Sequence, residues 1–230
     1  MCGRYTLTSQ KIVEDLELAV AEPSEPSEWW RPRFNIAPTQ PAPVVPNREG
    51  PRGIEMMRWG LLPPWSKSLS ESSRRINARV ETAATSPAFR DALRQRRCLV
   101  LADGFFEWRD TPEGRAPFYI RPVPRRPVTF AGLWERWKDP GGSWVLTFAI
   151  LTGPANKLVA PYHHRMPLVV ERSECDRWLD RSETEPTTLM DILAPWSPHD
   201  WRVSPVSPHV NRPQNDDPSC VEPILDSPLH

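Results

Sequence analysis

The stretch from residue 98 to residue 151 constrains the fold most strongly, because it consists of apolar runs separated by tight-turn residues. The runs are rich in β-branched and aromatic residues and have the length of strands. They span residues 98–103, 116–121, 128–137 and 143–151. Turn residues separate them at 111–114 (TPEG) and 139–142 (DPGG). No helical pattern falls between successive strands, and this disfavours a doubly wound parallel sheet. We therefore predict an α+β fold with a mainly antiparallel, barrel-like β-sheet core and short peripheral helices.

Shorter elements are expected on both sides of this core. The apolar runs at 42–46, 54–62 and 166–171 predict further strands. Helices are predicted from a Ser9 cap to about residue 21, from Ser86-Pro87 onward, and at 173–179 and 187–193. Residues 22–32 are rich in Pro, Ser and Glu and predict a variable surface loop, and the Pro-rich tail from residue 200 is predicted to be irregular. Since no stretch resembles an interdomain linker, we expect a single domain spanning residues 1–230.

Composition excludes several classes of protein. A hydrophobic content of 39% with 11 tryptophans in 230 residues indicates a globular chain. No apolar run approaches the roughly 18 residues of a membrane span, and no signal-peptide pattern opens the sequence, so a cytoplasmic protein is predicted. The four cysteines lack metal-ligand spacing. They are therefore expected to be free thiols, and no metal or cofactor is predicted.

The charges favour arginine and cluster in one region. Formal net charge is zero, which removes the simplest argument for nucleic-acid binding, a basic domain. Between residues 52 and 97, however, the sequence contains ten basic residues and only four acidic ones, and Trp59 and Trp65 lie in the same stretch. Aromatic rings interleaved with arginines hold single-stranded nucleic acid by stacking on bases and pairing with phosphates. The same arginine bias can also come from a GC-rich coding sequence, and most tryptophans belong to the core.

The second residue of the chain carries distinctive chemistry. If Met1 is removed, Cys2 presents a thiol and an α-amine on one carbon, with ordinary pKa values of roughly 8.5 and 7.7–8.0. An aldehyde can form a Schiff base with this amine, after which the thiolate closes a thiazolidine ring. Alternatively, the amine can act as the internal base for the thiol, as in hydrolases with N-terminal nucleophiles. Arg4 adds a positive charge that is expected to favour the thiolate. Cys2 can equally be a small buried apolar residue.

Three further stretches combine polar groups in ways that suit a site. In 76–81 (INARVE), Asn77, Arg79 and Glu81 would share one face of an extended segment. Glu107 is flanked by aromatics just after a strand, where apolar surroundings raise a carboxyl pKa and suit it to acid–base work; it can instead pair with a core arginine. In 162–167 (YHHRMP), two adjacent histidines would point to different sides if the segment is extended, so at most one serves a given site.

Taken in order along nearly the whole chain, these stretches resemble one family: the SOS response-associated peptidase (SRAP) domain, whose members crosslink themselves to abasic sites in single-stranded DNA. The matching stretches are 1–5 (MCGRY), 33–39 (RFNIAPT), 59–60 (WG) with Trp65, 76–82 (INARVET), 97–98 (RC), 103–108 (DGFFEW), 152–156 (TGPAN), 163–167 (HHRMP) and 210–211 (VN).

The resemblance implies four catalytic positions. Cys2, exposed by the loss of Met1, would join its amine and thiol to the ring-opened aldehyde of the abasic sugar as a thiazolidine. Asn77 would hold the N-terminal residue or the sugar, and Glu107 would act as general acid and base and in a self-removal of Met1. His163 would help to open the sugar ring.

The resemblance also implies a DNA-binding set. Phosphates would be contacted by Arg4, Arg79 and Arg165, bases beside the lesion would pack on Trp65 and Pro38, and Thr152 would belong to the same surface. The implied partner is single-stranded DNA containing abasic sites, with no membrane partner, and a monomer is the default expectation.

One departure and two alternatives stay open from the sequence. The family usually has Asp after its histidine, whereas this chain has His164, so the imidazole must be oriented by His164 in another way or by the backbone. The double histidine also leaves His164 as a second candidate. The alternatives to crosslinking are a thiol hydrolase with an N-terminal cysteine acting on small amides or peptides, and a nonenzymatic binding module for single strands or modified bases.

Overall fold

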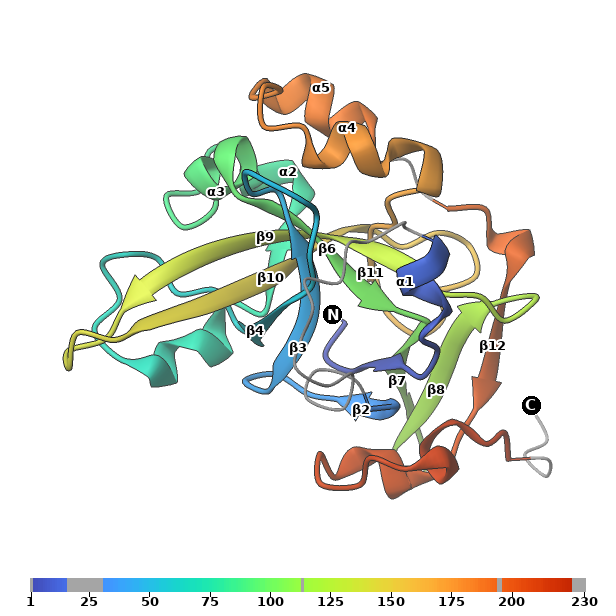
Figure 1. The fold of residues 1–230 in the computed structure, drawn as a ribbon. Helices are drawn as coiled ribbons and strands as arrows, with labels where there is room; N and C mark the ends of the chain where they lie inside the picture. Colours follow the sequence, from blue (N-terminus) through green and yellow to red (C-terminus); the bar gives the residue numbers. More distant parts are fainter. Residues whose placement is uncertain (1, 16–30, 113, 194–195, 225–230) are drawn as a thin grey trace.

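The computed structural model describes residues 2–15, 31–112, 114–193 and 196–224. Most of the helix expected after Ser9, and most of the expected loop at 22–32, lie outside these ranges. The predicted α+β class with a mainly antiparallel core is confirmed (Figure 1). All described pairings are antiparallel except two, which join β10 to β4 and to β5. Of the described helices, none has both the length and the apolar character needed to cross a bilayer.

The larger sheet closes on itself. Its strands are β3 (Pro41–Pro46), β4 (Glu55–Trp59), β5 (Asn77–Arg79), β6 (Arg97–Ala102), β9 (Val128–Lys138), β10 (Trp144–Pro154) and β11 (Arg165–Pro167). Because β10 pairs with β4 on one side and with β9 on the other, β10, β4, β3, β6 and β9 form a closed ring. β5 and β11 add to β10 near its C-terminal end. Closure leaves no free edge within the ring, which is the usual solution for a small antiparallel barrel.

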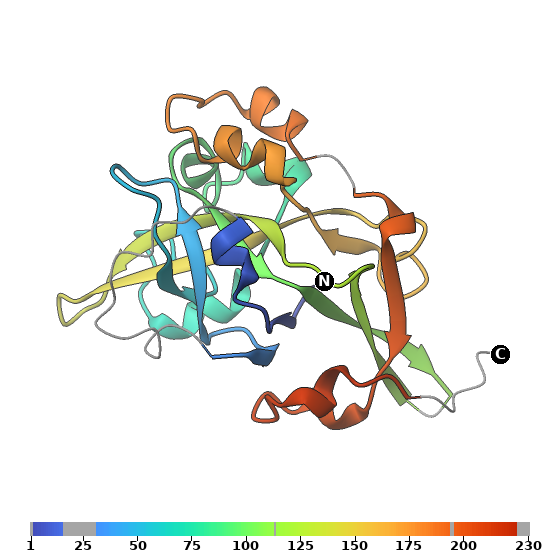
Figure 2. The same ribbon diagram turned by 45° about the vertical axis from the view of Figure 1, so that its right-hand side comes forward.

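The second sheet packs against the ring and is open. It runs in the order β12-β8-β7-β1-β2, with β1 (Tyr5–Leu7), β2 (Arg33–Ile36), β7 (Gly104–Thr111), β8 (Gly114–Pro122) and β12 (Trp201–Pro205). Figure 2 shows β12 lying along β8 on the outer side. The two sheets share one apolar core, in which Tyr5 of β1 meets the rings of Trp59 and Phe130 of the closed sheet edge-on at centroid distances of 5.1 and 6.2 Å. The N-terminal strand is thereby fixed at the junction of the two sheets.

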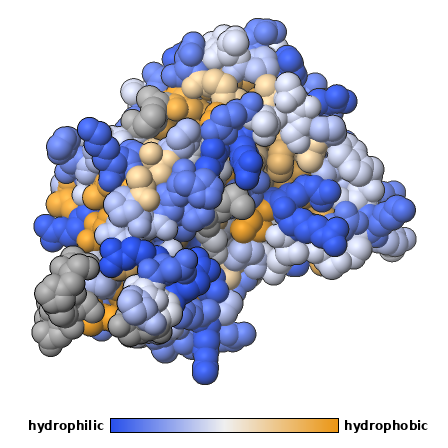
Figure 3. Space-filling model, turned by 180° about the vertical axis from the view of Figure 1, so that it is seen from behind, coloured by the Kyte–Doolittle hydropathy of each residue, from blue (hydrophilic) through white to orange (hydrophobic). Residues whose placement is uncertain are grey.

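Short helices cover the outside, as predicted. The α-helices are α1 (Lys11–Asp15), α2 (Val80–Ala83), α3 (Arg90–Gln95), α4 (Cys175–Leu179) and α5 (Pro186–Asp191), and the 3-10 helices are η1 (Leu69–Arg74), η2 (Arg172–Glu174), η3 (Pro198–Asp200), η4 (Pro208–Asn211) and η5 (Pro218–Val221). Figure 1 shows α2 to α5 gathered over one end of the closed sheet. On the face seen from behind, side chains are mainly hydrophilic and the apolar ones form small separate areas (Figure 3).

Four expectations from the sequence are wrong in detail. Glu107 lies within β7, not after a strand, and the tail contains β12 as well as irregular turns. The helix expected from Ser86 starts at Arg90, because residues 86–89 form a turn in which the Phe89 N–H bonds to the Ser86 carbonyl at 3.0 Å. The extended segment at 76–81 ends at Arg79, so Glu81 lies in α2 and does not share a strand face with Asn77.

Gly60 shows why the chain turns where β4 ends. Its φ of +130° is rarely adopted by L side chains, and an added Cβ would lie 2.3 Å from the Ser72 carbonyl oxygen. Only glycine fits this combination of backbone angle and close approach. The turn stays tied to the closed sheet, because the Gly60 N–H donates to the Phe148 carbonyl of β10 at 2.7 Å.

Candidate active site

Cys2 is anchored to the closed sheet by one side-chain hydrogen bond. Residues 2–4 lead into β1, and the Asn77 Nδ2 donates to the Cys2 carbonyl oxygen at 2.8 Å. Asn77 opens β5, which pairs in parallel with β10 at Ile150. The position of Cys2 is therefore fixed by two strands that are distant in the sequence, β1 and β5.

The thiol of Cys2 is fully buried. Its side chain is 0% exposed, and its Sγ donates a weak hydrogen bond to the Arg4 carbonyl at 3.8 Å. Burial raises the pKa of the thiol far above its usual value, and the negative charge of Glu107 raises it further. The expectation that Arg4 favours the thiolate is therefore wrong for the chain carrying Met1. In this state the thiol is protonated at neutral pH and is a poor nucleophile.

Glu107 has the properties of an acid–base group at neutral pH. It lies on β7 between Phe106 and Trp108 and is only 2% exposed. Desolvation by burial raises the pKa of its carboxyl to about 7, although the charge of Arg115 acts in the opposite direction. A carboxyl with this pKa is present in both protonation states near pH 7, so it can donate and accept a proton with similar ease.

His163 is held as a neutral imidazole by the backbone. The Arg165 N–H donates to His163 Nδ1 at 2.9 Å, so the neutral ring carries its proton on Nε2. Burial lowers the pKa of His163 to about 4, and the charge of the neighbouring His164 contributes to the lowering. The two imidazoles stack with centroids 4.3 Å apart, since the chain is not extended at these two residues and β11 begins only at Arg165. Of the two ways of orienting His163 that the sequence left open, the structure shows the one through the backbone.

These groups meet at one pocket. A cavity of about 520 Å³ is lined by Gly3, Arg4, Glu107, Trp108, Arg115, His163 and Asn211. Three sequence-predicted residues, Arg4, Glu107 and His163, thus face the same space. Cys2 and Asn77 do not line this cavity, although Gly3, the neighbour of Cys2, does. No role was predicted from the sequence for Arg115 or Asn211, although Asn211 belongs to the last matching motif.

Arg4 links the pocket to the C-terminal part of the chain. One of its guanidinium nitrogens, Nη1, donates to the Asn35 Oδ1 at 2.9 Å and to the Val210 carbonyl at 2.7 Å, while Nη2 donates to the Asn211 carbonyl at 3.2 Å. The Trp108 Nε1 donates to the Asn211 Oδ1 at 2.7 Å, so Asn211 also holds the indole at the pocket wall. The positive charge of Arg4 is therefore fixed at the pocket by neutral oxygen partners, and no carboxylate among the described residues pairs with it.

Arg165 and Thr152 lie beneath the site. The Arg165 guanidinium donates to both carboxylate oxygens of Glu81, at 2.6 and 2.9 Å, and to the Thr152 carbonyl. Arg165 is buried and Thr152 is 0% exposed. This geometry favours a structural role, because it places the backbone N–H that orients His163 on a residue locked by a bidentate ion pair. It offers neither side chain directly to a DNA strand.

Loss of this ion pair should destabilise the protein. Glu81→Ala is expected to lower the free energy of unfolding by about 1 kcal/mol, because Arg165 loses its bidentate partner while the Glu81 side chain is itself 46% exposed and screened by solvent. Urea denaturation of the variant and the wild type measures the difference. Glu174→Ala, which removes an exposed i,i+3 partner of Arg177, is the matched control and should cost less than about 0.5 kcal/mol. Equal losses for both variants would contradict the structural role of Arg165.

Three other predicted residues remain accessible outside the pocket. Arg79 is exposed at the end of β5, Trp65 is 56% exposed, and Pro38 is partly exposed just before Thr39, a non-glycine residue with a φ of +70°. The main chain of Thr39 is tied to β4, since its N–H donates to the Trp59 carbonyl at 2.8 Å. These side chains are free to contact a ligand that extends beyond the pocket.

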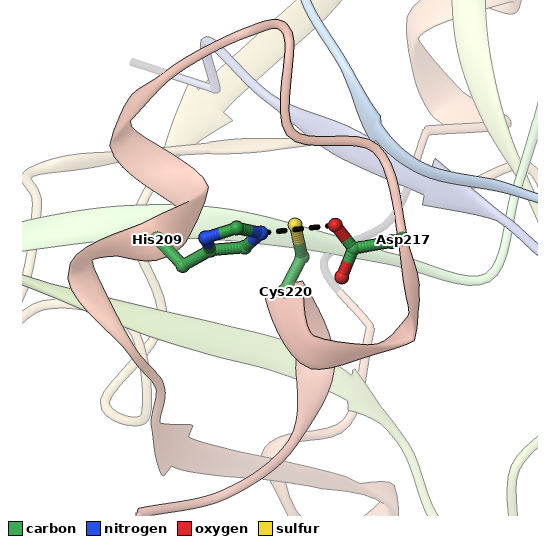
Figure 4. A group of neighbouring side chains, drawn as sticks. All are labelled: His209, Asp217 and Cys220. Carbon is green, nitrogen blue, oxygen red and sulfur yellow. Dashed lines mark hydrogen bonds and ion pairs between the residues drawn. The ribbon is translucent and has the colours of Figure 1, made fainter.

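A single set of three potential metal ligands is found among the described residues. His209, Asp217 and Cys220 come from the turns around η4 and η5 and face one another (Figure 4). The Asn215 amide nitrogen lies 3.1 Å from His209 Nδ1, so Nδ1 accepts and the neutral ring carries its proton on Nε2, facing Asp217 at 2.9 Å. The cluster as arranged is a hydrogen-bonded clamp that holds the segment around Val210 and Asn211 against Arg4.

Comparison with known proteins gives a consistent result. The family model described as SOS response associated peptidase (SRAP) matches residues 1–213. The Bacillus subtilis protein named abasic site processing protein YoqW is 35% identical over 225 residues, which cover 96% of this chain and 99% of that protein. The Gallus gallus protein named abasic site processing protein HMCES is 31% identical, over 85% of this chain and 67% of that protein.

Solved structures share the fold. A crystal structure of a Bacteroides thetaiotaomicron protein superposes with a TM-score of 0.83, covering 97% of this chain and 100% of that one at 24% identity. A Bordetella bronchiseptica protein superposes with a TM-score of 0.75, covering 90% of this chain and 100% of that one at 25% identity. The arrangement of two sheets around the N-terminal strand is therefore one that other chains adopt.

Proposed function

Because the chain belongs to the SOS response associated peptidase (SRAP) family, we propose that it processes abasic sites in single-stranded DNA by forming a covalent link through Cys2. The names of the relatives supply the substrate class. The geometry of the pocket supports the chemistry, since an acid–base carboxyl and a neutral imidazole line one cavity, and Cys2 is held next to Gly3, which lines the same cavity.

The proposed reaction begins once Met1 has been removed. The α-amine of Cys2 attacks the aldehyde carbon of the ring-opened abasic sugar, and loss of one water gives a Schiff base. The thiol then adds to the same carbon through its sulfur and gives its proton to the imine nitrogen. The net change joins an aminothiol and an aldehyde into a thiazolidine and releases one water. The atoms and electrons balance with these two reactants alone.

The observation that carries the proposal is the hydrogen bond from Asn77 to the Cys2 carbonyl at 2.8 Å. A flexible N-terminus would sample many positions, and ordering it would cost free energy at each encounter. With its carbonyl anchored between β1 and β5, Cys2 keeps its reactive atoms beside Glu107, whose charge is felt by the thiol. Such preorganisation is a main source of rate acceleration.

Glu107 and His163 supply the proton transfers in this proposal. Protonated Glu107 donates a proton to the hydroxyl that leaves as water during Schiff-base formation, and the resulting carboxylate accepts a proton from the amine. The neutral His163, with its proton on Nε2, donates a hydrogen bond to the sugar ring oxygen and assists ring opening. The low pKa of His163 keeps the imidazole from competing as a cation with Arg4 for phosphate.

DNA is proposed to approach across the exposed side chains next to the pocket. Arg4 and Arg79 would pair with phosphates, while Trp65 and Pro38 would pack on bases. We also propose that the pocket removes Met1, with Glu107 activating the water that hydrolyses the Met1–Cys2 peptide bond. This step would account for the peptidase in the family's description.

The proposal is tested by mixing the processed protein with a single-stranded oligonucleotide that contains one abasic site and separating the products under heat and denaturant. A heat-stable band that migrates as the covalent protein–oligonucleotide adduct is expected with the abasic oligonucleotide and not with an intact one. Turnover of small amides without any adduct would instead support an N-terminal thiol hydrolase. Reversible binding alone would support a nonenzymatic module.

A further inference from the structure

A second cavity lies outside the pocket, where the β9–β10 hairpin extends beyond the closed sheet. Its volume is about 750 Å³. We call it the hairpin groove and define it by six of its lining residues: Arg48, Arg96, Trp134, Arg136, Trp144 and Arg181. Figure 1 shows the hairpin projecting away from the N-terminus, so the groove and the pocket are separate features.

Trp144 is the residue of the groove that the fold explains least. It is 58% exposed near the tip of the hairpin, where burial in the core is impossible. Arg136 and Lys138 of β9 approach its ring, with the charged atom 5.0 and 5.8 Å from the ring centroid. An exposed indole flanked by two cations presents a flat apolar surface beside positive charge. Trp134, by contrast, is 8% exposed under Arg48 and belongs to the wall of the groove.

The groove has an excess of positive charge. Three of its arginines have carboxylate partners: Arg48 with Glu55 at 2.8 Å, Arg96 with Glu135 at 2.8 Å, and Arg181 with Glu49 at 2.5 Å. Arg136 makes no ion pair with any described residue, and its charge together with that of Lys138 is left over. This positive charge favours an anionic ligand, and the exposed indole favours one with flat rings.

We propose that the hairpin groove is a second binding surface for single-stranded DNA, distinct from the pocket that reacts with the lesion. Bases would stack on Trp144 and phosphates would pair with Arg136, the combination by which proteins hold single strands without sequence preference. The proposal rests on the proposed function for the choice of DNA as the anion. Nucleic acid is the expected ligand, and not an acidic peptide, because the carboxylates of a peptide would pair with the arginine but would not stack on the exposed indole ring.

The distance along β10 between the groove and the site decides how long a DNA strand must be to contact both. Trp144 lies six residues before Ile150, the partner of Asn77 in the register, which is roughly 20 Å of strand at about 3.3 Å per residue. An oligonucleotide only long enough to fill the pocket cannot reach both surfaces. A longer strand can, and its second contact gains from the high effective concentration created by the first.

The test compares affinities for undamaged single-stranded DNA of about 5 and about 20 nucleotides. Fluorescence anisotropy is measured with wild type, Trp144→Ala and Arg136→Glu. Both variants are expected to bind the longer strand at least about fivefold more weakly, the factor that corresponds to about 1 kcal/mol for one lost stacking contact. Arg136→Glu should also reduce the dependence of affinity on salt. The short strand can occupy either surface but not both, so its affinity should fall by a smaller factor than that of the longer strand.

Arg202→Glu is the matched charge-reversal control, since Arg202 is exposed on β12 in the other sheet. It should leave the affinity for the longer strand within about twofold of wild type. Wild-type affinity in both groove variants would overturn the inference, and so would equal weakening by Arg202→Glu. Displacement of the longer strand by polyglutamate at equal charge concentration would overturn the commitment to nucleic acid.

Failure of this inference is distinguishable from failure of the proposed function. Crosslinking of a short abasic oligonucleotide depends on the pocket alone, so its yield should not change in Trp144→Ala. If this yield is normal while the affinity for long strands is unchanged, only the groove proposal fails. If wild type forms no adduct but the groove variants weaken strand binding, the covalent chemistry fails and the groove stands.

Discussion

Replacing Cys2 with alanine is expected to abolish the heat-stable adduct with abasic DNA. The variant keeps an α-amine on its N-terminal residue, because alanine is small enough to permit removal of Met1. Its amine can still form a Schiff base, but without sulfur the thiazolidine cannot close. A Schiff base hydrolyses on heating, so the band should fall to background. The same reaction run with borohydride should restore a band, because reduction converts the imine into a stable amine.

The control for this variant is Cys175→Ala. Cys175 is also buried, but it lies at the start of α4 beside Thr129, with its Sγ 3.8 Å from the Thr129 hydroxyl. Its replacement should leave adduct formation unchanged while removing one thiol of similar burial. A heat-stable adduct in Cys2→Ala, or its loss in Cys175→Ala, would contradict the assignment of the link to Cys2.

Replacing Glu107 with glutamine is expected to slow adduct formation by about 100-fold at pH 7, the lower end of what a positioned acid–base group contributes. Wild type should show a bell-shaped pH–rate profile. Its rate rises as the α-amine loses its proton, with an ordinary pKa of roughly 7.7–8.0, and falls as Glu107, whose pKa is raised to about 7, loses the proton it must donate. The variant should lose the falling limb and reach a plateau above about pH 8.

The rates are compared on protein released from a cleavable N-terminal fusion, so that Cys2 is the first residue in both forms. This separates the crosslinking step from the removal of Met1, for which Glu107 is also proposed. When the two proteins are expressed without the fusion, Glu107→Gln should retain Met1. An unchanged pH profile in the processed variant would remove Glu107 from the crosslinking step.

Stability gives an independent readout of the Glu107 environment. A carboxyl whose pKa is higher in the folded chain than in the unfolded chain favours folding when protonated, so its effect is fully present below about pH 4.5 and is lost as pH rises through about 7. The free energy of unfolding of wild type should therefore fall relative to Glu107→Gln over this interval. The total change should approach about 3 kcal/mol, since one pKa unit corresponds to about 1.4 kcal/mol.

The fold class was predictable because the strands of the closed sheet carry their own signals. β9 and β10 are long apolar runs joined by a turn in which the Gly142 N–H bonds to the Asp139 carbonyl at 2.9 Å. β7 was not predicted although its partner β8 was, because the strand expected at 98–103 was taken to end before Glu107, and its other partner, β1, lies far away in the sequence. β12 was hidden by prolines, which an edge strand tolerates.

The site could be predicted only in part. Cys2, Glu107 and His163 were predicted as site residues from their residue types and from the resemblance to a family. The contacts that determine their positions and protonation, however, join distant parts of the chain. Asn77 is 75 residues from Cys2, and Glu81 is 84 residues from Arg165. No periodicity encodes such pairs. The deep burial of the Cys2 thiol and the stacking of the two histidines likewise depend on how the sheets pack.

The proposed link through Cys2 is tested most directly by the intact mass of the product formed with an abasic oligonucleotide. We predict a species whose mass equals that of the chain without Met1 plus that of the oligonucleotide, less one water, with Cys2 carrying the link after digestion. Such a mass that survives heating without any reductant would identify the thiazolidine. A link mapped to a lysine, or a chain that retains Met1 and still forms the adduct, would contradict it.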